Sequence, residues 1–190
     1  MGLRNGIRKR LGAVENLYFP RCGDMRYTVV NELSNFQFHD AELKSIDFEA
    51  HCMKWEVAHI NAMTSNSKNE LDVDMCIDNA IMVFNDIAIE SVIYGAYTER
   101  DSSGNITEHK PVTIKSNEHL DTLRNIPNEG CYLYAMEELV VIDKNRYKAC
   151  FHIDFNTFLT FTFSQSIISW NGFIGKAWYE DEKWKTQPRT

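Results

Sequence analysis

Proline and glycine are scarce in this chain, with four and nine residues among 190. Their scarcity excludes a collagen-like repeat and a proline- or glycine-rich low-complexity chain. No run approaches the ~20 apolar residues of a membrane-spanning helix, so we expect no membrane partner. The chain does contain 11 phenylalanines, eight tyrosines and four tryptophans. These side chains and a hydrophobic fraction of 44% predict one folded domain with a substantial core.

The motifs of several common enzyme classes are also missing. The sequence has no GxGxxG or GxxxxGK[ST] nucleotide-binding motif, no GxSxG nucleophile motif and no HExxH zinc motif. Its five cysteines form no CxxC pair, and their odd number and wide spacing argue against a disulfide framework or a structural zinc site. We therefore expect no cofactor, no bound metal, and reduced cysteines in a cytoplasmic protein.

Charge is distributed unevenly along the chain. Residues 1–24 carry five basic and two acidic side chains, a net +3, whereas residues 25–190 carry 15 basic and 25 acidic side chains, a net −10. Because an acidic surface repels phosphate backbones, we expect no nucleic-acid partner. Long-range attraction favours a basic protein partner, and the alternative is that the charge serves solubility alone.

The first 24 residues differ from the rest in composition. They hold four of the nine glycines and show no sustained hydrophobic period. We expect a basic flexible extension at 1–24, or an upstream translated stretch before a start at Met25, followed by a single β-rich domain at 25–190. Glu15–Phe19 (ENLYF) is similar to part of a protease-tag site, with Pro20 in place of the expected glutamine. No apolar run follows the basic start, so no secretory signal is expected.

Period-two alternation of apolar and polar residues dominates the chain after Met25. Its parity flips between Leu43–Phe48 and Met53–Ile60, as two strands joined by a hairpin turn at Glu49–Cys52 require. The other predicted strands are Leu71–Ile77, Ile81–Phe84, Ile87–Tyr94, Val112–Lys115, Cys131–Ile142, Tyr147–Phe155, Leu159–Ser164 and Ile167–Trp170. Residues 81–84 and 87–94 are rich enough in apolar side chains for central strands.

One helix is predicted, over Asn117–Arg124, with Ser116 as its N-cap and with Leu120 and Leu123 facing the core. Arg100–Lys110 (RDSSGNITEHK) is predicted as an exposed loop. Roughly eight to ten short strands and one short helix predict a mainly β fold, with α+β as the alternative. The expected architecture is an antiparallel sheet, sandwich or barrel-like.

Phe36–Ala41 (FQFHDA) is the most distinctive local string. A histidine moves protons near neutral pH and an adjacent carboxylate orients or charges it, so His39 and Asp40 are candidate catalytic residues. His152 is a third candidate, and it shares a strand face with Cys150. The structural alternative is that Asp40 turns the chain while His39 is a satisfied structural residue, because neighbours in a strand point to opposite faces.

The string Phe-His-Asp-Ala, followed by two strands, resembles the start of small uncharacterised bacterial β domains. Among them are some of the immunity-protein families that neutralise polymorphic toxins, and the sequence is most similar to the Imm50-like group. The resemblance covers about residues 36–60. It implies a non-catalytic protein that binds a cognate toxin, and it carries over no catalytic residue.

Two acidic segments are candidate binding surfaces. Asp72, Asp74 and Asp78 share one face of the predicted strand Leu71–Ile77, for which an ordinary solvated face is the alternative. The candidates near the C-terminus are Trp178, Trp184, Glu180 and Asp181. Tryptophans anchor protein interfaces and carboxylates select the charge of a partner. The alternative for the aromatic residues places Trp170, Phe173 and Trp178 in the core.

Together these features favour a non-catalytic binding protein of bacterial origin, an immunity-type protein that holds a basic toxin through its acidic faces. The second hypothesis is a small metal-dependent or His/Asp hydrolase that uses His39, Asp40 and His152. The third is a structural homo-oligomeric module with an aromatic self-interface. We expect a monomer or a homodimer.

Overall fold

The structure, a computed structural model, describes residues 25–127, 130–154 and 156–181. It is mostly β, as the alternation predicts, and its main element is a sheet of ten antiparallel strands. In spatial order the strands of this large sheet are β1 (Tyr27–Val30), β15 (Gln165–Trp170), β7 (Asn79–Asn85), β4 (Cys52–Ala58), β3 (Ala41–Glu49), β12 (Tyr132–Asp143), β13 (Arg146–Ile153), β14 (Thr157–Phe163), β8 (Ala88–Tyr94) and β11 (Val112–Thr113).

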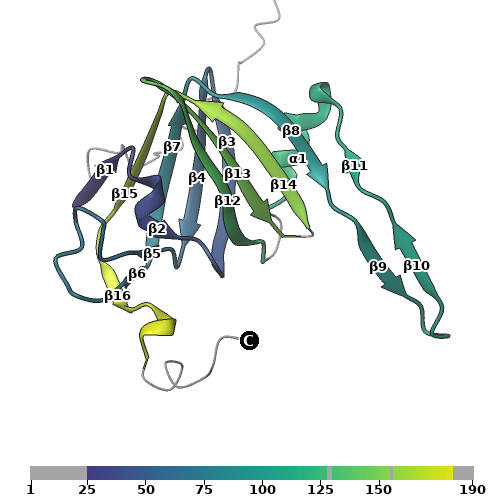
Figure 1. Cartoon of the computed structure of the whole chain (residues 1–190), viewed down its shortest axis with the longest axis horizontal. Helices are drawn as coiled ribbons and strands as arrows, with labels where there is room; N and C mark the ends of the chain where they lie inside the picture. Colours follow the sequence, from purple (N-terminus) through teal and green to yellow (C-terminus); the bar gives the residue numbers. More distant parts are fainter. Residues whose placement is uncertain (1–24, 128–129, 155, 182–190) are drawn as a thin grey trace, which may run out of the picture.

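The remaining elements form a small sheet, a protruding hairpin and four short helices (Figure 1). The small sheet has the order β16 (Phe173–Lys176), β6 (Met75–Ile77), β5 (Asn61–Ala62) and β2 (Phe36–Gln37). The hairpin, which we call the arm, pairs β9 (Tyr97–Arg100) with β10 (Ile106–His109). The helices are η2 (Leu33–Asn35), η3 (Ser116–Glu118), α1 (His119–Asn125) and η4 (Trp178–Glu180).

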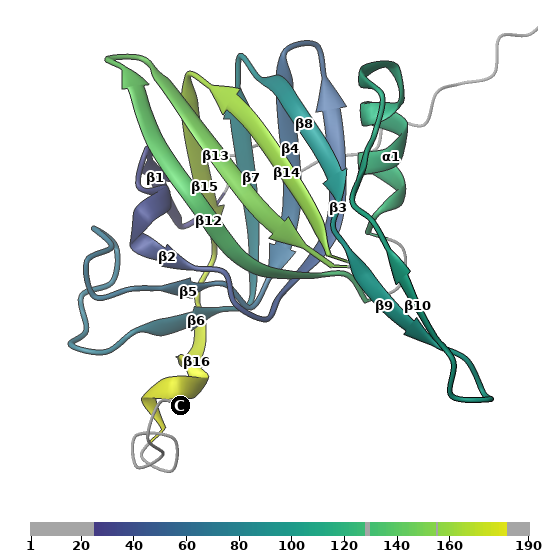
Figure 2. The same ribbon diagram turned by 45° about the vertical axis from the view of Figure 1, so that its right-hand side comes forward.

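The large sheet bends between β3 and β12, where only Tyr132 and Leu133 pair with Glu42 and Ala41. As a result, β12, β13, β14 and β8 form one layer, and β15, β7, β4 and β3 form the layer behind it (Figure 2). Among the described residues the edge strands β1 and β11 do not pair with each other. The two layers are therefore sandwich-like, and the barrel alternative does not form as a closed barrel.

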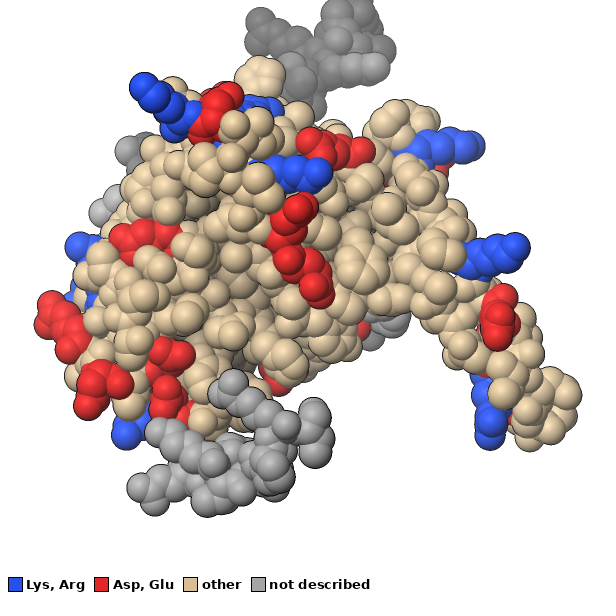
Figure 3. All heavy atoms as spheres, viewed as in Figure 1, with Lys and Arg blue, Asp and Glu red and all other residues tan. Residues whose placement is uncertain are grey.

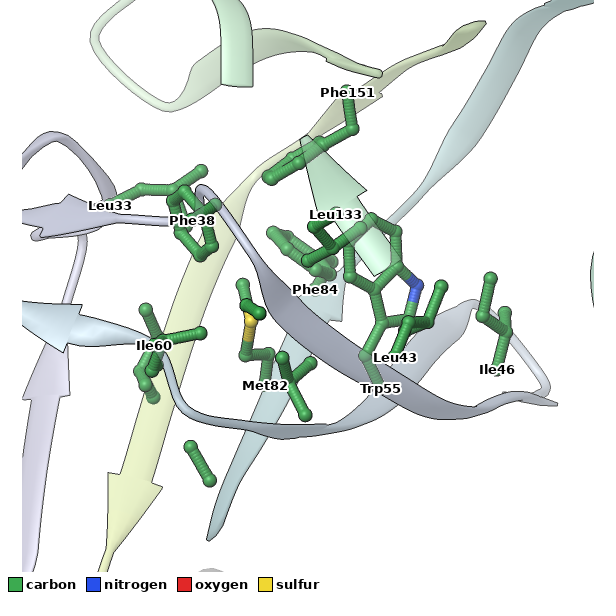
Figure 4. Close-up of a cluster of buried hydrophobic side chains, with 14 of the residues drawn as sticks. Leu33, Phe38, Leu43, Ile46, Trp55, Ile60, Met82, Phe84, Leu133 and Phe151 are labelled. Carbon is green, nitrogen blue, oxygen red and sulfur yellow. The ribbon is translucent and has the colours of Figure 1, made fainter. Parts of the chain in front are cut away.

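Aromatic side chains fill the space between the two layers, as Figure 4 shows for part of the core. Trp55 on β4 lies 4.9 Å from Phe151 on β13, and Phe84 on β7 lies 4.9 Å from Phe161 on β14, measured between ring centroids. All four rings are fully buried. Edge-to-face contacts of this kind add to the gain from burial. Trp55, Phe151 and Phe161 thus lie on the apolar faces that the alternation predicts for their strands.

Helix α1 lies beside β3 and β8 and covers one open side of the core. It begins at His119 rather than at Asn117, and Ser116 lies in η3, with no side-chain hydrogen bond capping either helix. Leu123 is fully buried as predicted, but Leu120 is 42% exposed. His119 is buried instead of Leu120, because it lies four residues before Leu123 and so shares the same helix face. The His119 Nε2 lies 3.0 Å from the Ile114 carbonyl oxygen.

Several predicted segments differ from the structure in extent or type. Only Met75–Ile77 of the predicted strand Leu71–Ile77 forms β6. The Asn69 side chain donates to the carbonyl oxygen of Val73 over 2.9 Å and to that of Ala62 over 3.0 Å, which holds the preceding segment in a loop. Of residues 87–94, Ala88–Tyr94 form β8, which pairs with β14 on one side and with the two-residue strand β11 on the other. Residues 100–110 include β10 and are not a loop throughout.

The arm continues β8 and β11 away from the body (Figures 1 and 2). At its base the backbone N–H of Gly95 donates to the Asn156 carbonyl oxygen over 2.7 Å, and the Asn156 side chain donates to the Ala96 carbonyl oxygen over 2.7 Å. A Cβ atom on Gly95 would lie 2.3 Å from Asn156 Nδ2. Glycine is therefore required here for close approach, and the contact fixes the base of the arm.

Replacing Gly95 with alanine is expected to destabilise the protein by about 1–3 kcal/mol, because the new methyl group overlaps both the side chain and the backbone of Asn156. Urea unfolding followed by circular dichroism measures the loss. Gly172→Ala is the matched control, because its Cβ would meet no atom within 4 Å, and it should change stability by less than about 0.5 kcal/mol. Equal urea midpoints for the two variants would show that the close contact between Gly95 and Asn156 does not contribute to stability.

Candidate functional site

The FHDA string forms a turn that links β2 to β3. Phe36, Phe38 and Ala41 are buried, and Asp40 has a positive φ of 64°. This backbone conformation is uncommon for a residue other than glycine and is typical of a tight turn. Asp40 therefore turns the chain, as the structural alternative predicted. The apolar residues of the string pack in the core.

His39 and Asp40 contact each other, because they lie in a turn and not in a strand. His39 Nδ1 is 2.8 Å from Asp40 Oδ2, and both side chains are 57% exposed. An exposed pair of this kind is only weakly held in water. The ring centroid of His39 is 6.2 Å from that of Trp178. The turn thus lies beside the C-terminal aromatic residues and faces solvent.

His152, the third candidate catalytic residue, has other neighbours. Its ring centroid is 5.1 Å from that of Tyr134, and its Nδ1 is 3.6 Å from Glu137 Oε1. No contact between described residues joins His152 to His39 or Asp40. The three candidates are therefore not assembled into one catalytic group by direct contact.

The cysteine nearest to this histidine in sequence, Cys150, is half-buried on the same strand. Cys131 is buried, and this burial together with the negative charge of Asp154 raises the pKa of its thiol to about 11. The thiolate and not the thiol is the nucleophile, so Cys131 is suited to packing and not to covalent catalysis.

The two acidic segments that we predicted as binding surfaces come together. The Tyr179 hydroxyl donates to Asp74 Oδ2 over 2.8 Å, although the two residues are 105 positions apart. The Ala177 N–H also donates to the Asp74 carbonyl oxygen over 2.8 Å. These bonds hold η4 against the segment before β6, and Figure 3 shows acidic side chains gathered at the lower left, over this part of the fold. We name this surface the acidic end and define it by Asp72, Asp74, Trp178, Glu180 and Asp181. The predicted binding residue Asp78 follows β6 at its other end and lies near Asn171 and Phe173.

Asp74 holds the acidic end together. Its second carboxylate oxygen, Oδ1, accepts a hydrogen bond from the Thr64 N–H over 2.7 Å. Burial, then the hydrogen bond to Asp74, raises the pKa of Tyr179 well above its usual value, so the phenol remains a donor. The prediction that Asp74 lies on a strand face with Asp72 is wrong, because residues 71–74 form a loop. Asp72 and Asp78 are exposed.

Trp178 is 48% exposed, which corrects the alternative that placed it in the core. Trp170 is fully buried and Phe173 packs against the core, as that alternative predicted for both. The other predicted aromatic anchor, Trp184, lies outside the described residues. The acidic end thus presents an exposed tryptophan beside several carboxylates.

A concave surface, the arm-base groove, lies between the arm and the body and has a volume of about 1180 Å³. Its wall residues include Tyr94, Tyr97, His109, Tyr134, His152 and Asp154. Of these, only His152 was a candidate from the sequence. The sequence signal for the arm is limited to the turn residues at 102–104, because the strands on either side are exposed on both faces.

No cluster of three or more histidine, cysteine, aspartate or glutamate side chains within the described ranges is arranged to hold a metal ion. The helices of the same ranges include none with the length and hydropathy needed to cross a membrane. Comparisons with protein-family models, with curated proteins and with solved structures find no match to this chain.

Proposed function

We propose that this chain is a non-catalytic binding protein that holds a basic protein partner at its acidic end. The observation that carries the proposal is the bond between Tyr179 and Asp74, which joins two acidic segments and the exposed Trp178 into one surface. An exposed tryptophan on η4, which the Tyr179–Asp74 bond joins to the acidic segment before β6, has the composition of an interface anchor with charge selection.

The net charge of −10 over residues 25–190 supports the same proposal. An acidic body attracts a basic partner over long range and raises the rate of encounter, more strongly at low salt. Binding is favoured over hydrolysis, because the described contacts do not bring His39 and Asp40 together with His152.

The finer proposal is an immunity-type protein whose basic partner is a toxin. It is supported by the resemblance carried by Phe36–Ala41 and by the position of that string. The His39 ring lies beside Trp178, so the segment that carries the resemblance borders the acidic end.

The test is affinity purification of the tagged full chain from its host, followed by association kinetics with the captured partner. We expect one stoichiometric basic protein that dissociates at high salt. A triple variant, Asp72→Asn with Glu180→Gln and Asp181→Asn, should bind it about tenfold more weakly, because three favourable charges are removed. Asp74 is left unchanged because it is needed for the local structure.

The control has the same change in charge at three exposed positions elsewhere: Glu49→Gln, Glu118→Gln and Asp121→Asn. The affinity of this variant for the partner should stay within about twofold of that of the unmodified protein, since the three altered charges lie away from the acidic end. If both triple variants weaken binding equally, or if the association rate does not depend on salt, the acidic end is not the binding surface.

A further inference from the structure

The arm-base groove has one wall on the arm. In the β9–β10 pairing, Tyr97 is opposite His109 and Glu99 is opposite Thr107, so these four side chains share one face. The rings of Tyr97 and His109 stack with centroids 4.2 Å apart and an interplanar angle of 6°. Glu99 Oε2 lies 3.2 Å from His109 Nε2. This wall is therefore aromatic and carries a carboxylate.

The other wall belongs to the body. His152 stacks on Phe158 with ring centroids 4.5 Å apart and contacts Tyr134 on its other side. The Tyr134 hydroxyl lies 3.4 Å from Asp154 Oδ1, and the charge of Asp154, with a smaller contribution from Asp40, raises the pKa of Tyr134. This wall thus also combines aromatic rings with negative charge.

Carboxylates outnumber the fixed positive charge around the groove. Asp154 lines it directly, while Glu99 and Glu137 contact its two histidines. Lys110 is the one lysine among the described lining residues. Val112 and Ile114 add apolar surface between the walls. A cation with a flat, weakly hydrated face matches this combination, because it is attracted by carboxylates and stacks on aromatic rings.

We propose that the arm-base groove binds an extended, arginine-bearing segment of the basic partner. This inference rests on the proposed function for the nature of the partner, and it adds a second contact surface. Arginine satisfies both features of the walls, since its guanidinium stacks on tyrosine and pairs with carboxylates. The volume of about 1180 Å³ is larger than a single side chain requires and accommodates several residues of an extended chain.

The probe is a nine-residue peptide, Ac-GRGRGRGRG-NH2, titrated into the full chain at 150 mM salt by calorimetry. Its control is the same peptide with citrulline at each arginine, which keeps the shape and removes the charge. We expect the arginine peptide to bind at least about tenfold more tightly than the citrulline peptide. Equal binding of the two peptides, or binding of neither, would overturn the proposal.

Two tyrosine variants locate the site. Tyr134→Leu should weaken binding of the arginine peptide by about three- to tenfold, because it removes one aromatic face. Tyr132→Leu is matched to it: the residue is on the same strand and is 42% exposed, against 40% for Tyr134, but it does not line the groove. It should leave the affinity within about twofold. Identical affinities for the two variants would overturn the assignment to the groove.

Two further outcomes separate this inference from the proposed function and from another occupant. If the acidic-end triple variant abolishes peptide binding while Tyr134→Leu retains it, the groove proposal is overturned and the acidic end is supported. If sedimentation velocity shows a dimer that Tyr134→Leu dissociates, a second copy fills the groove and the proposal is overturned. Groove binding of the peptide without any basic partner from the host would overturn the proposed function instead.

Discussion

Replacing Phe84 with alanine is expected to lower the free energy of unfolding by about 4 kcal/mol. The Phe84 ring is fully buried between the two layers of the large sheet. Its centroid is 5.4 Å from Trp55 in its own layer, and 4.9 Å and 5.2 Å from Phe161 and Phe163 in the facing layer. Removing the Phe84 ring would leave a cavity bordered by rings from both layers. The surrounding side chains would fill this cavity only in part.

Guanidinium unfolding monitored by tryptophan fluorescence measures this loss. A domain of this size is typically stable by about 5–15 kcal/mol, so the variant should be close to its folding limit at 37 °C. Phe158→Ala is the matched control, because Phe158 is half-buried on the outer face of β14 and should cost only about 1 kcal/mol. Equal losses for the two variants would show that Phe84 does not join the layers.

Replacing Asp74 with alanine is expected to cost about 3 kcal/mol. The change removes the acceptor for both the Thr64 N–H and the Tyr179 hydroxyl. Hydrogen bonds to a charged group are worth about 1.5–3 kcal/mol each, and the partly buried phenol would lose its partner. Because η4 then loses a contact with the body, partner binding at the acidic end should weaken together with stability.

Thermal unfolding of this variant is compared with that of Asp72→Ala and Tyr179→Phe. Asp72 is exposed, so its removal should change stability by less than about 0.5 kcal/mol. Tyr179→Phe removes one hydrogen bond and should cost about 1 kcal/mol. If Asp72→Ala destabilises the protein as much as Asp74→Ala does, the loss reflects the acidic charge and not the hydrogen bonds of Asp74.

Where one face of a strand is buried, the sequence pattern predicted the structure well. Trp55, Phe151 and Phe161 alternate with polar neighbours, and each faces the core as expected. Alternation fails at Leu71–Asp74, because side-chain hydrogen bonds from Asn69 hold that segment in a loop. It also left the arm unassigned, since both faces of the arm are exposed and the pattern carries no inside–outside contrast.

The candidate binding surface was predictable in its parts but not as a whole. Acidic residues and the C-terminal aromatics stand out in the sequence, but nothing local indicates that Tyr179 reaches Asp74. The exposure of Trp178 is likewise decided by the geometry of η4 and not by its hydrophobicity. The arm-base groove depends on residues from β9, β10, β12 and β13, which the sequence separates.

Alternation and composition are local properties, so the amino-acid sequence is enough to predict a mainly β fold with an aromatic core and an acidic body. Three further features arise only from tertiary contacts: the bend that makes two layers, the contact between the two acidic segments, and the groove beside the arm. Each of these depends on contacts between residues far apart in the chain. Such contacts are selected by the packing and hydrogen bonding of the whole fold and leave no local pattern.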